Sequence, residues 1–355
     1  MNSSNEPKKY DVILVAGEGK SSYKVYHQNK AFLTLQGKCI ILYVVEALQQ
    51  VQSIRDIYIV GLKEKLDQVL HSGRIDREYP KRIHVVEQKA NLYENVWQTF
   101  LQSQQMELED ADTTTHRDKA VLIVPCDAPL ITPQEVEYFI SHADMNRYDH
   151  VLGLVSREKL RHFYPQASKP GIKMAYLHIQ KDSYRINNLH LVKPLCIENR
   201  EYIQKMYQYR YQRNFKNLVL FGLSLFGKDK ARHYKNYIGL QLCLFFASLR
   251  LNFLVNYFRK FNPKEVLEKR ICTIMKTRFM ALQVPYPGAA LDIDNAKDYD
   301  AMKIRFDEWW KYLQEYKEEP LPVATNYIEV SPTARTEKVA RPSSTPLSTP
   351  SGHEG

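Results

Sequence analysis

The sequence has few cysteines, and none of them is spaced as in a metal or redox motif. Five cysteines are scattered over 355 residues without a Cys-x-x-Cys pair. Their odd number and wide spacing argue against a disulfide framework and against a zinc site. The first nine residues are polar and lack the apolar stretch of a signal peptide. We therefore expect a protein of the reducing cytoplasm.

Apolar runs long enough to cross a membrane are also missing. The longest candidate, residues 237–258, is interrupted by Gln241, Arg250, Asn252 and Asn256. A charge near the middle of a membrane span costs roughly 2.5–3.5 kcal/mol. We find no internal repeat. The composition, 44% apolar and 25% charged, is typical of a soluble globular protein with a sizeable core.

Glycine-rich nucleotide motifs are absent in their standard forms. Gly17 and Gly19 follow the apolar run Val12–Val15, but Ser22 occupies the third position of the Gly-x-Gly-x-x-Gly pattern. The four-residue spacer of a P-loop is missing as well. What remains is a glycine turn after a predicted buried strand, where backbone amides can approach phosphate oxygens closely. A plain turn is the alternative.

What the sequence does contain is an alternation of apolar runs and amphipathic segments, which predicts an α/β fold. Short apolar runs are typical of buried strands, and apolar residues at helical spacing are typical of helices. We expect strands at 12–15, 56–60, 83–86, 120–124, 150–155, 281–284 and 289–293, a hairpin of 172–179 and 185–192, and helices at 39–51, 63–70, 92–101, 297–316 and after the N-cap Thr132. Strands that alternate with helices pair in parallel. The sequence predicts a Rossmann-like three-layer α/β/α core with a mixed, mainly parallel sheet.

Acidic residues occur where such a sheet binds its ligands, at the carboxyl ends of strands. Asp127 follows the predicted strand 120–124, and a carboxylate there can hold Mg²⁺ against phosphates. Asp292 and Asp294 lie two apart in the predicted strand 289–293, so both point to one face. Two such carboxylates repel unless a cation or basic group lies between them. A turn-forming aspartate and a solvated strand are the alternatives.

Taken together, these motifs resemble the nucleotidyltransferase superfamily that includes molybdenum cofactor guanylyltransferase, methylerythritol-phosphate cytidylyltransferase and CMP-sugar synthetases. The family's first motif is matched by Ala16-Gly17-Glu18-Gly19-Lys20, followed by Lys30-Ala31-Phe32-Leu33. The second is matched by Asp127-Ala128-Pro129-Leu130-Ile131-Thr132, and the third by Asp292-Ile293-Asp294-Asn295-Ala296-Lys297-Asp298. All three occur in the family's order.

The resemblance implies a role for each motif. Nucleotide phosphates would be bound by Ala16, Gly17, Glu18, Gly19, Lys20 and Lys30. Mg²⁺ would be held by Asp127 and Asp294, with support from Asp292. The expected catalytic residues are then Lys20, Lys30 and Asp127. The reaction would be in-line attack by an acceptor phosphate oxygen on the α-phosphorus of an NTP, which needs positioning and charge neutralisation rather than a covalent nucleophile.

The first motif also departs from the family pattern. Glu18 adds a negative charge where some relatives have glycine, and Ser21 stands where an arginine is common. Lys20 or Lys24 can replace that arginine, but a lysine lacks the bidentate fork of a guanidinium. A catalytically degenerate fold that binds a membrane or a partner is therefore one alternative. A molybdenum cofactor guanylyltransferase-like enzyme is another.

The basic charge of the chain is concentrated in one aromatic-rich segment. Residues 201–280 contain 16 Lys plus Arg against 4 Asp plus Glu, whereas the whole chain has a net charge of +10. We predict a basic helical insert that either packs on the core, forms a homodimer contact or touches an anionic membrane peripherally. No RNA-binding motif supports a specific nucleic-acid partner.

Position and charge alone suggest an acceptor site on the hairpin before this insert. Its predicted acceptor-binding residues are Lys173, Arg185, Asn187, Asn188 and Lys193; a solvated hairpin is the alternative. We thus expect a first core part at 8–198, the insert at 199–280, core completion at 281–317 and a disordered tail at 318–355. The expected function is Mg²⁺-dependent transfer of NMP from an NTP to a sugar or polyol phosphate, with release of pyrophosphate.

Overall fold

The structure, a computed structural model, describes residues 8–18, 24–73, 80–107, 116–180, 182–200 and 251–317, with a few residues between 203 and 249. Gly19 and Lys20 of the predicted nucleotide loop and most of the predicted insert lie outside these residues, as does the predicted tail. The described elements all belong to the first of two compact units, which ends at Leu321. The bounds of the predicted insert therefore stay a prediction.

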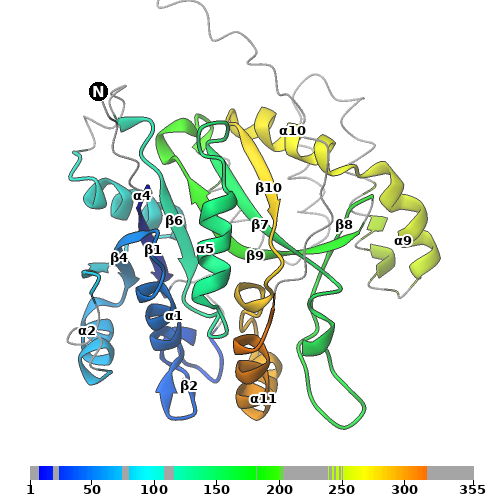
Figure 1. Ribbon diagram of the computed structural model, residues 1–355, viewed down its shortest axis with the longest axis horizontal. Coiled ribbons are helices and arrows are strands. Elements are labelled where there is room, and N and C mark those ends of the chain that lie inside the picture. The colour runs from blue at the N-terminus through cyan, green and yellow to red at the C-terminus, as the bar shows by residue number, and fades with distance from the viewer. Residues whose placement is uncertain are drawn as a thin grey trace, which may run out of the picture. The chain divides into compact units, whose positions relative to one another are not determined.

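An eight-stranded sheet organises this unit (Figure 1). Its strands are β1 (Tyr10–Ala16), β4 (Ile54–Gly61), β5 (Ile83–Glu87), β6 (Val121–Pro125), β7 (His150–Ser156), β8 (Leu177–His178), β9 (Ser183–Val192) and β10 (Phe279–Gln283). The order is β10-β7-β9-β6-β1-β4-β5, and β8 pairs with β9. Strand β9 pairs antiparallel with β6, β7 and β8. The other described pairings in this sheet are parallel. The predicted mixed, mainly parallel sheet is confirmed.

Helices cover both faces of the sheet, because the buried strands direct alternate residues to opposite sides. One face carries α1 (Ile40–Gln49), α2 (Lys63–Ser72), α5 (Pro133–His142) and α11 (Ala296–Gln314). There Leu14 of β1 shares an apolar cluster with Phe139 of α5 and Trp309 of α11. Figure 1 shows α5 in front of the sheet.

The opposite face carries α4 (Leu92–Ser103) and α10 (Lys264–Met275). Ile13 of β1 packs with Trp97 and Phe100 of α4. Ile123 of β6 contacts this cluster and also the cluster that includes Ile271 of α10, so the two helices lie on the same side. The predicted α/β/α layering is confirmed. In this described part, no helix is long and apolar enough to cross a membrane, and the five cysteines are free thiols.

Helix starts follow the local signals in the sequence. The Thr132 hydroxyl accepts a hydrogen bond from the backbone N–H of Glu135 at 3.3 Å, and Pro133 occupies the first helical position of α5, as predicted. Asn295 caps α11 in the same way through the N–H groups of Lys297 and Asp298. This second cap fixes where α11 begins within the acidic third motif.

Two predicted strands are wrong in extent or in kind. The first arm of the hairpin, predicted at 172–179, shrinks to β8, because β9 lies between β6 and β7 and takes these strands as its main partners. The predicted strand 289–293 is instead a 3-10 turn, Gly288–Ala290, followed by irregular chain. Its backbone groups form hydrogen bonds with side chains and with a loop carbonyl that are distant in sequence. The segment therefore needs no neighbouring strand.

Candidate active site

Five charged side chains from distant segments meet beside the carboxyl ends of β1 and β6. The Lys30 Nζ lies 2.9 Å from Asp127 Oδ2 and 3.8 Å from Asp294 Oδ1. The Arg185 Nη2 lies 2.7 Å from Asp292 Oδ1 and 3.6 Å from Asp294 Oδ2. Asp294 is thus shared by two cations, and the five side chains form one alternating chain of charge. The structure brings together four residues predicted for phosphate or metal binding and one predicted for the acceptor.

The lysine is positioned by the asparagine that precedes it. Asn29 donates a hydrogen bond from its side chain to the carbonyl of Ala16 at 3.2 Å and accepts one from the N–H of Ala31 at 2.9 Å. It therefore ties the end of β1 to the 3-10 turn that Lys30 begins. Asp127 comes two residues after β6, which pairs in parallel with β1. Both groups consequently lie at the same edge of the sheet.

The segment that carries the other two aspartates is held by four long-range hydrogen bonds. Arg185 Nε donates to the carbonyl of Ala290 at 2.9 Å, and the side chain of Asn188 donates to the carbonyl of Ala289 at 3.2 Å. The N–H of Ala289 donates to the Glu135 carboxyl at 2.7 Å, and the N–H of Ile293 donates to the carbonyl of Asp127 at 3.0 Å. Asp292 and Asp294 therefore converge on Arg185, although they do not lie on a strand.

Burial and mutual repulsion shift the pKa values of this cluster. Burial lowers the pKa of Lys30, but Asp127, Asp294 and Asp292 outweigh it and raise that pKa to about 12. Burial raises the pKa of Asp127, against the opposing effect of Lys30. Burial and the charge of Asp292 raise the pKa of Asp294 to about 6. Both carboxyls are thus harder to ionise than an exposed aspartate, so a bound cation would stabilise their charged forms.

The donor set suits a hard divalent cation chemically. Carboxylate oxygens are the ligands that Mg²⁺ prefers, usually one or two from the protein with the rest from phosphates and water. Asp127 and Asp294 could supply these two. Among the residues that the structure describes, no three His, Cys, Asp or Glu are grouped so that they could hold a metal by themselves. The site therefore fits a metal shared with a phosphorylated ligand rather than a preformed protein cage.

The described part of the glycine loop is held by side chains that sequence analysis missed. The Gln88 side chain accepts a hydrogen bond from the N–H of Glu18 at 2.6 Å and donates one to its carbonyl at 2.8 Å. A Cβ on Gly17 would lie 2.9 Å from the Asn95 side chain, so only glycine fits there without displacing it. The carboxylate of Glu18 forms an ion pair with Lys24. Its negative charge, which departs from the family pattern, is thus compensated locally.

Gln88 and Asn95 could have been found from the predicted elements. Gln88 follows β5, at the same sheet edge as the end of β1, and Asn95 lies in the first turn of α4. Polar residues at these positions face the loop because parallel strands end at one edge. The positions of Gln88 and Asn95 in the sequence thus indicate their role, although neither residue belongs to a known motif.

The remaining predicted acceptor residues are dispersed. Asn187 is fully buried, and its side chain accepts a hydrogen bond from the N–H of Leu189 at 3.2 Å. The Asn188 side chain donates its hydrogen bond to the carbonyl of Ala289, as described above. Lys173 is exposed. Lys193 is buried in ion pairs with Asp118 at 2.7 Å and Asp149 at 3.9 Å.

Lys193 lies at the opposite edge of the sheet from Asp127. The neighbouring residue Val192 pairs with Val121 and His150, the first residues of β6 and β7. Asp127 follows the other end of β6. The structure does not bring Lys193 to the cluster.

The strand order, the loop at the end of β1 and this charged cluster define an α/β protein of the nucleotidyltransferase class. Residues 12–219, more than half of the 355-residue chain, match the MobA-like NTP transferase domain. The chain belongs to this family. No curated protein matches it.

Three solved structures are similar to the chain at low sequence identity. A hypothetical transferase from Thermus thermophilus is 18% identical, with a TM-score of 0.55, and the match covers 82% of this chain and 99% of that chain. The 4-diphosphocytidyl-2C-methyl-D-erythritol synthase from Anaerococcus prevotii is 10% identical, with a TM-score of 0.41, covering 85% and 97%. CMP:2-keto-3-deoxy-manno-octonic acid synthetase complexed with CTP is 9% identical, with a TM-score of 0.42, covering 85% and 99%. The first of these supports the fold assignment.

Proposed function

We propose that the chain is a magnesium-dependent nucleotidyltransferase that transfers NMP from an NTP to a phosphorylated acceptor, a sugar or polyol phosphate, and releases pyrophosphate. Family membership supports the use of an NTP. The observation that carries the proposal is the position of Lys30 between Asp127 and Asp294, beside the loop after β1. Phosphoryl chemistry of this kind needs fixed positive charge and metal-binding carboxylates at one point.

The residues of the chain would divide the work as follows. The amides of the loop that begins at Ala16 would contact the phosphates, together with Lys20, which lies outside the described residues. Asp127 and Asp294 would hold Mg²⁺, with Asp292 in support. Mg²⁺, when bound, supplies charge neutralisation at the phosphates. Lys30, whose pKa is about 12, stays protonated at neutral pH and would stabilise the negative charge that develops on the leaving pyrophosphate.

Among the five predicted acceptor residues, Arg185 is the one we assign to the acceptor phosphate. Its guanidinium already contacts Asp292 and Asp294, so an acceptor bound there would lie next to the proposed metal. A guanidinium binds phosphate oxygens in a bidentate manner. Lys173, Asn187, Asn188 and Lys193 lack this placement.

Ligand-induced thermal stabilisation tests the proposal directly. The full chain is heated with each of the four NTPs, with and without Mg²⁺, beside Asp127→Asn and the control Asp67→Asn, which alters an exposed residue of α2. A ligand at 100 times its Kd stabilises the native state by about 2.7 kcal/mol. We expect one NTP to raise the melting temperature, only with Mg²⁺ and only when Asp127 is intact. If no NTP does so, the nucleotidyltransferase proposal fails.

Release of pyrophosphate then identifies the acceptor. With the preferred NTP and Mg²⁺, a panel of sugar and polyol phosphates is screened for acceptor-dependent pyrophosphate. If the preferred nucleotide is GTP and a pterin cofactor is the acceptor, the molybdenum cofactor guanylyltransferase-like alternative replaces the sugar or polyol phosphate.

A catalytically degenerate binding module is the second candidate function. The observation that favours it is the pairing of charges within the cluster itself, since Lys30 and Arg185 together contact all three aspartates. Nucleotide binding that does not depend on Mg²⁺, without pyrophosphate release for any acceptor, would select this reading. Nucleotide binding that requires Mg²⁺ and Asp127 would argue for the enzyme.

Residues 201–280 support two proposals about partners, a peripheral contact with an anionic membrane and a homodimer. Their excess of Lys and Arg favours the first. We also retain the cytoplasm as the proposed compartment, with no specific nucleic-acid partner. Cell fractionation separates the first proposal from the second, because a peripheral membrane protein is released from membranes by salt and a soluble dimer does not sediment with them.

A further inference from the structure

Helix α9 (Asn252–Phe258) and the 3-10 turn after it expose a row of apolar side chains. Phe253, Tyr257 and Phe261 follow one another at intervals of four residues, so they lie on one side. Their exposed fractions are 69%, 56% and 46%. Phe245 and Leu249, in the segment before α9, are exposed as well. We call Phe253, Tyr257 and Phe261 the apolar stripe.

The stripe is the outer face of a segment that is fixed to the domain. On the inner side, Val255 is buried. Arg259 Nε donates a hydrogen bond to the carbonyl of Ile179 at 2.9 Å, and the N–H of Gln180 donates one to the carbonyl of Asn262 at 3.0 Å. These bonds join the segment to the hairpin of β8 and β9, beside which Figure 1 shows it. The aromatic side chains are therefore exposed although α9 is docked.

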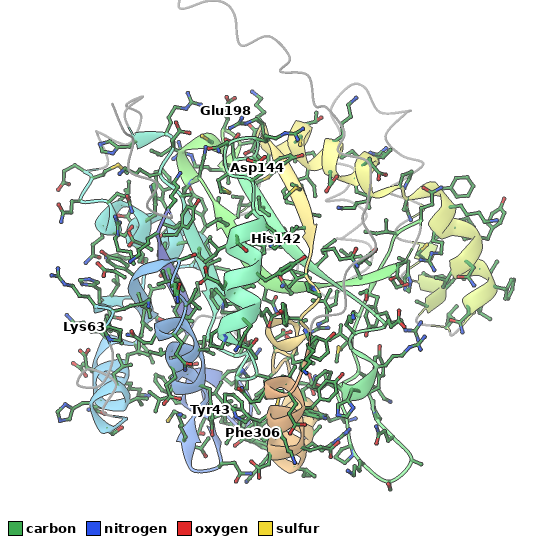
Figure 2. The ribbon with its side chains drawn as sticks, viewed as in Figure 1. Tyr43, Lys63, His142, Asp144, Glu198 and Phe306 are labelled. Carbon is green, nitrogen blue, oxygen red and sulfur yellow. The ribbon has the colours of Figure 1, made fainter. Side chains whose placement is uncertain are left out.

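Figure 2 shows α9 on the right, with side chains that project outward from its ribbon, whereas Val255 is buried. Adjacent contacts reinforce the stripe, since the rings of Tyr257 and Phe261 pack edge to face with centroids 5.8 Å apart. Exposed apolar patches of this kind usually mark an interaction site. The partner must accept several aromatic rings side by side.

The charge around the stripe identifies the chemistry of that partner. Lys260, between Tyr257 and Phe261, is exposed. Residues 251–278 contain seven Lys plus Arg against two Asp plus Glu, and of these cations Lys264, Lys276 and Arg278 are paired with carboxylates. Aromatic rings beside basic side chains are typical of segments that lie in the headgroup region of anionic bilayers. An apolar protein groove would not require the surplus of positive charge.

We propose that the apolar stripe docks on the surface of an anionic lipid bilayer. The rings of Phe253, Tyr257 and Phe261 enter the headgroup region, and Lys260 contacts lipid phosphates. The helix is seven residues long, far shorter than a membrane span of about 20 residues, so the contact is peripheral. This proposal goes beyond the reaction at the charged cluster and does not depend on it.

Vesicle flotation of the full chain tests the docking. The vesicles contain phosphatidylcholine alone or phosphatidylcholine with phosphatidylglycerol, and no nucleotide is present. The test variant replaces Phe253, Tyr257 and Phe261 by serine. The matched control is Ile304→Ser, which alters an apolar residue of α11 that is 68% exposed. Since all four positions are exposed, the variants should unfold at the wild-type temperature.

We expect the wild type and Ile304→Ser to float with phosphatidylglycerol vesicles and not with phosphatidylcholine alone, and to be released by high salt. The triple variant should bind at least about tenfold more weakly, because three inserted rings are lost. If the wild type does not float, or if the triple variant floats equally well, the proposal is wrong.

A second measurement separates membrane docking by the stripe from two alternatives. In one, another segment of the chain binds the vesicles; in the other, the stripe contacts a second copy of the chain. In Phe253→Trp, vesicles should shift the tryptophan emission to the blue, and brominated lipids should quench it beyond the signal of the three native tryptophans. Flotation without this quenching would assign binding to another segment and overturn the proposal. A wild-type dimer that becomes monomeric in the triple variant and never floats would also overturn it.

Discussion

Replacing Glu135 by leucine should loosen the segment that carries Asp292 and Asp294. Glu135 is fully buried on α5, and its carboxyl accepts the hydrogen bond from the N–H of Ala289. Burial raises its pKa well above the ordinary value, opposed by the hydrogen bond from the N–H of Ala289. The side chain is thus an acceptor within an apolar core, and leucine can fill its volume without accepting a hydrogen bond.

The magnitude follows from the groups left behind. Each buried donor that loses its acceptor costs about 1–3 kcal/mol, and at least the N–H of Ala289 is affected in Glu135→Leu. Removal of a costly buried carboxyl offsets part of this loss. We expect a net destabilisation of about 2 kcal/mol for Glu135→Leu and less than about 1 kcal/mol for Glu135→Gln, which keeps an acceptor.

The raised pKa adds a dependence on pH whose sign can be stated. Above the ordinary pKa near 4.5, the unfolded state releases a proton that the native state retains, so wild-type stability falls as pH rises toward the native pKa. Glutamine cannot titrate. As pH rises, the free energy of unfolding of Glu135→Gln should therefore increase relative to that of the wild type, by up to about 1.4 kcal/mol per pH unit. Above the native pKa of Glu135 this difference should stay constant.

Denaturant unfolding of the wild type and both variants from pH 4 to pH 8 measures these differences. Nucleotide-induced thermal stabilisation with Mg²⁺ serves as a second readout, which should fall in Glu135→Leu and persist in Glu135→Gln. The reasoning is refuted if glutamine destabilises the protein as much as leucine does, or if the difference between wild type and Glu135→Gln does not change with pH.

Three further predictions concern the charged cluster and the sheet. Lys30→Gln should lower pyrophosphate release by about 10²–10³-fold, the loss seen when one preorganised charge-stabilising group is removed; the exposed control Lys63→Gln should retain full activity. Arg185→Lys should raise the KM for the acceptor by about tenfold while the nucleotide-induced thermal shift stays, because a lysine cannot bind a phosphate in a bidentate manner; an equal loss of nucleotide binding would contradict the assignment. Burial, and secondarily His190, lower the pKa of His150 to about 3, so stability should fall as pH drops from 6.5 toward 3, and His150→Phe should flatten that slope in acid unfolding curves.

The helices and strands of the core could be predicted because their signals are local. The run at β1 and the cap at Thr132 are read within a few residues, and the structure has both. The prediction of a strand at 289–293 was wrong because the conformation of this segment depends on residues distant in sequence. Its alternating pattern fits a strand, yet Glu135 and Arg185, far away in sequence, take its backbone hydrogen bonds.

The acceptor residues show the same limit for the site. Arg185 and Lys193 were assigned to one site from charge and proximity in sequence. Arg185 lies in β9, an extended strand, and Lys193 directly follows its last residue. At roughly 3.4 Å per residue, the step of eight residues from Arg185 to Lys193 spans about 27 Å. Two residues so far apart on one strand cannot contact the same small acceptor. Register and strand length would have excluded Lys193, but neither could be predicted from a hairpin pattern alone.

The balance of charge in the cluster argues that metal must accompany the nucleotide. Lys30 and Arg185 face the three carboxylates of Asp127, Asp292 and Asp294, so the fully ionised cluster is negative. A triphosphate brings several more negative charges to the same place, and their repulsion in a partly buried site is strong. Without a divalent cation, binding would require the aspartates to take up protons, which the raised pKa of Asp294, about 6, makes accessible only in acid. NTP binding without Mg²⁺ should therefore be weak at pH 8 and strengthen toward pH 5, whereas binding with Mg²⁺ should not strengthen as pH falls. Isothermal titration at the two pH values, with and without the metal, decides whether the cluster is a metal site or a closed network of ion pairs.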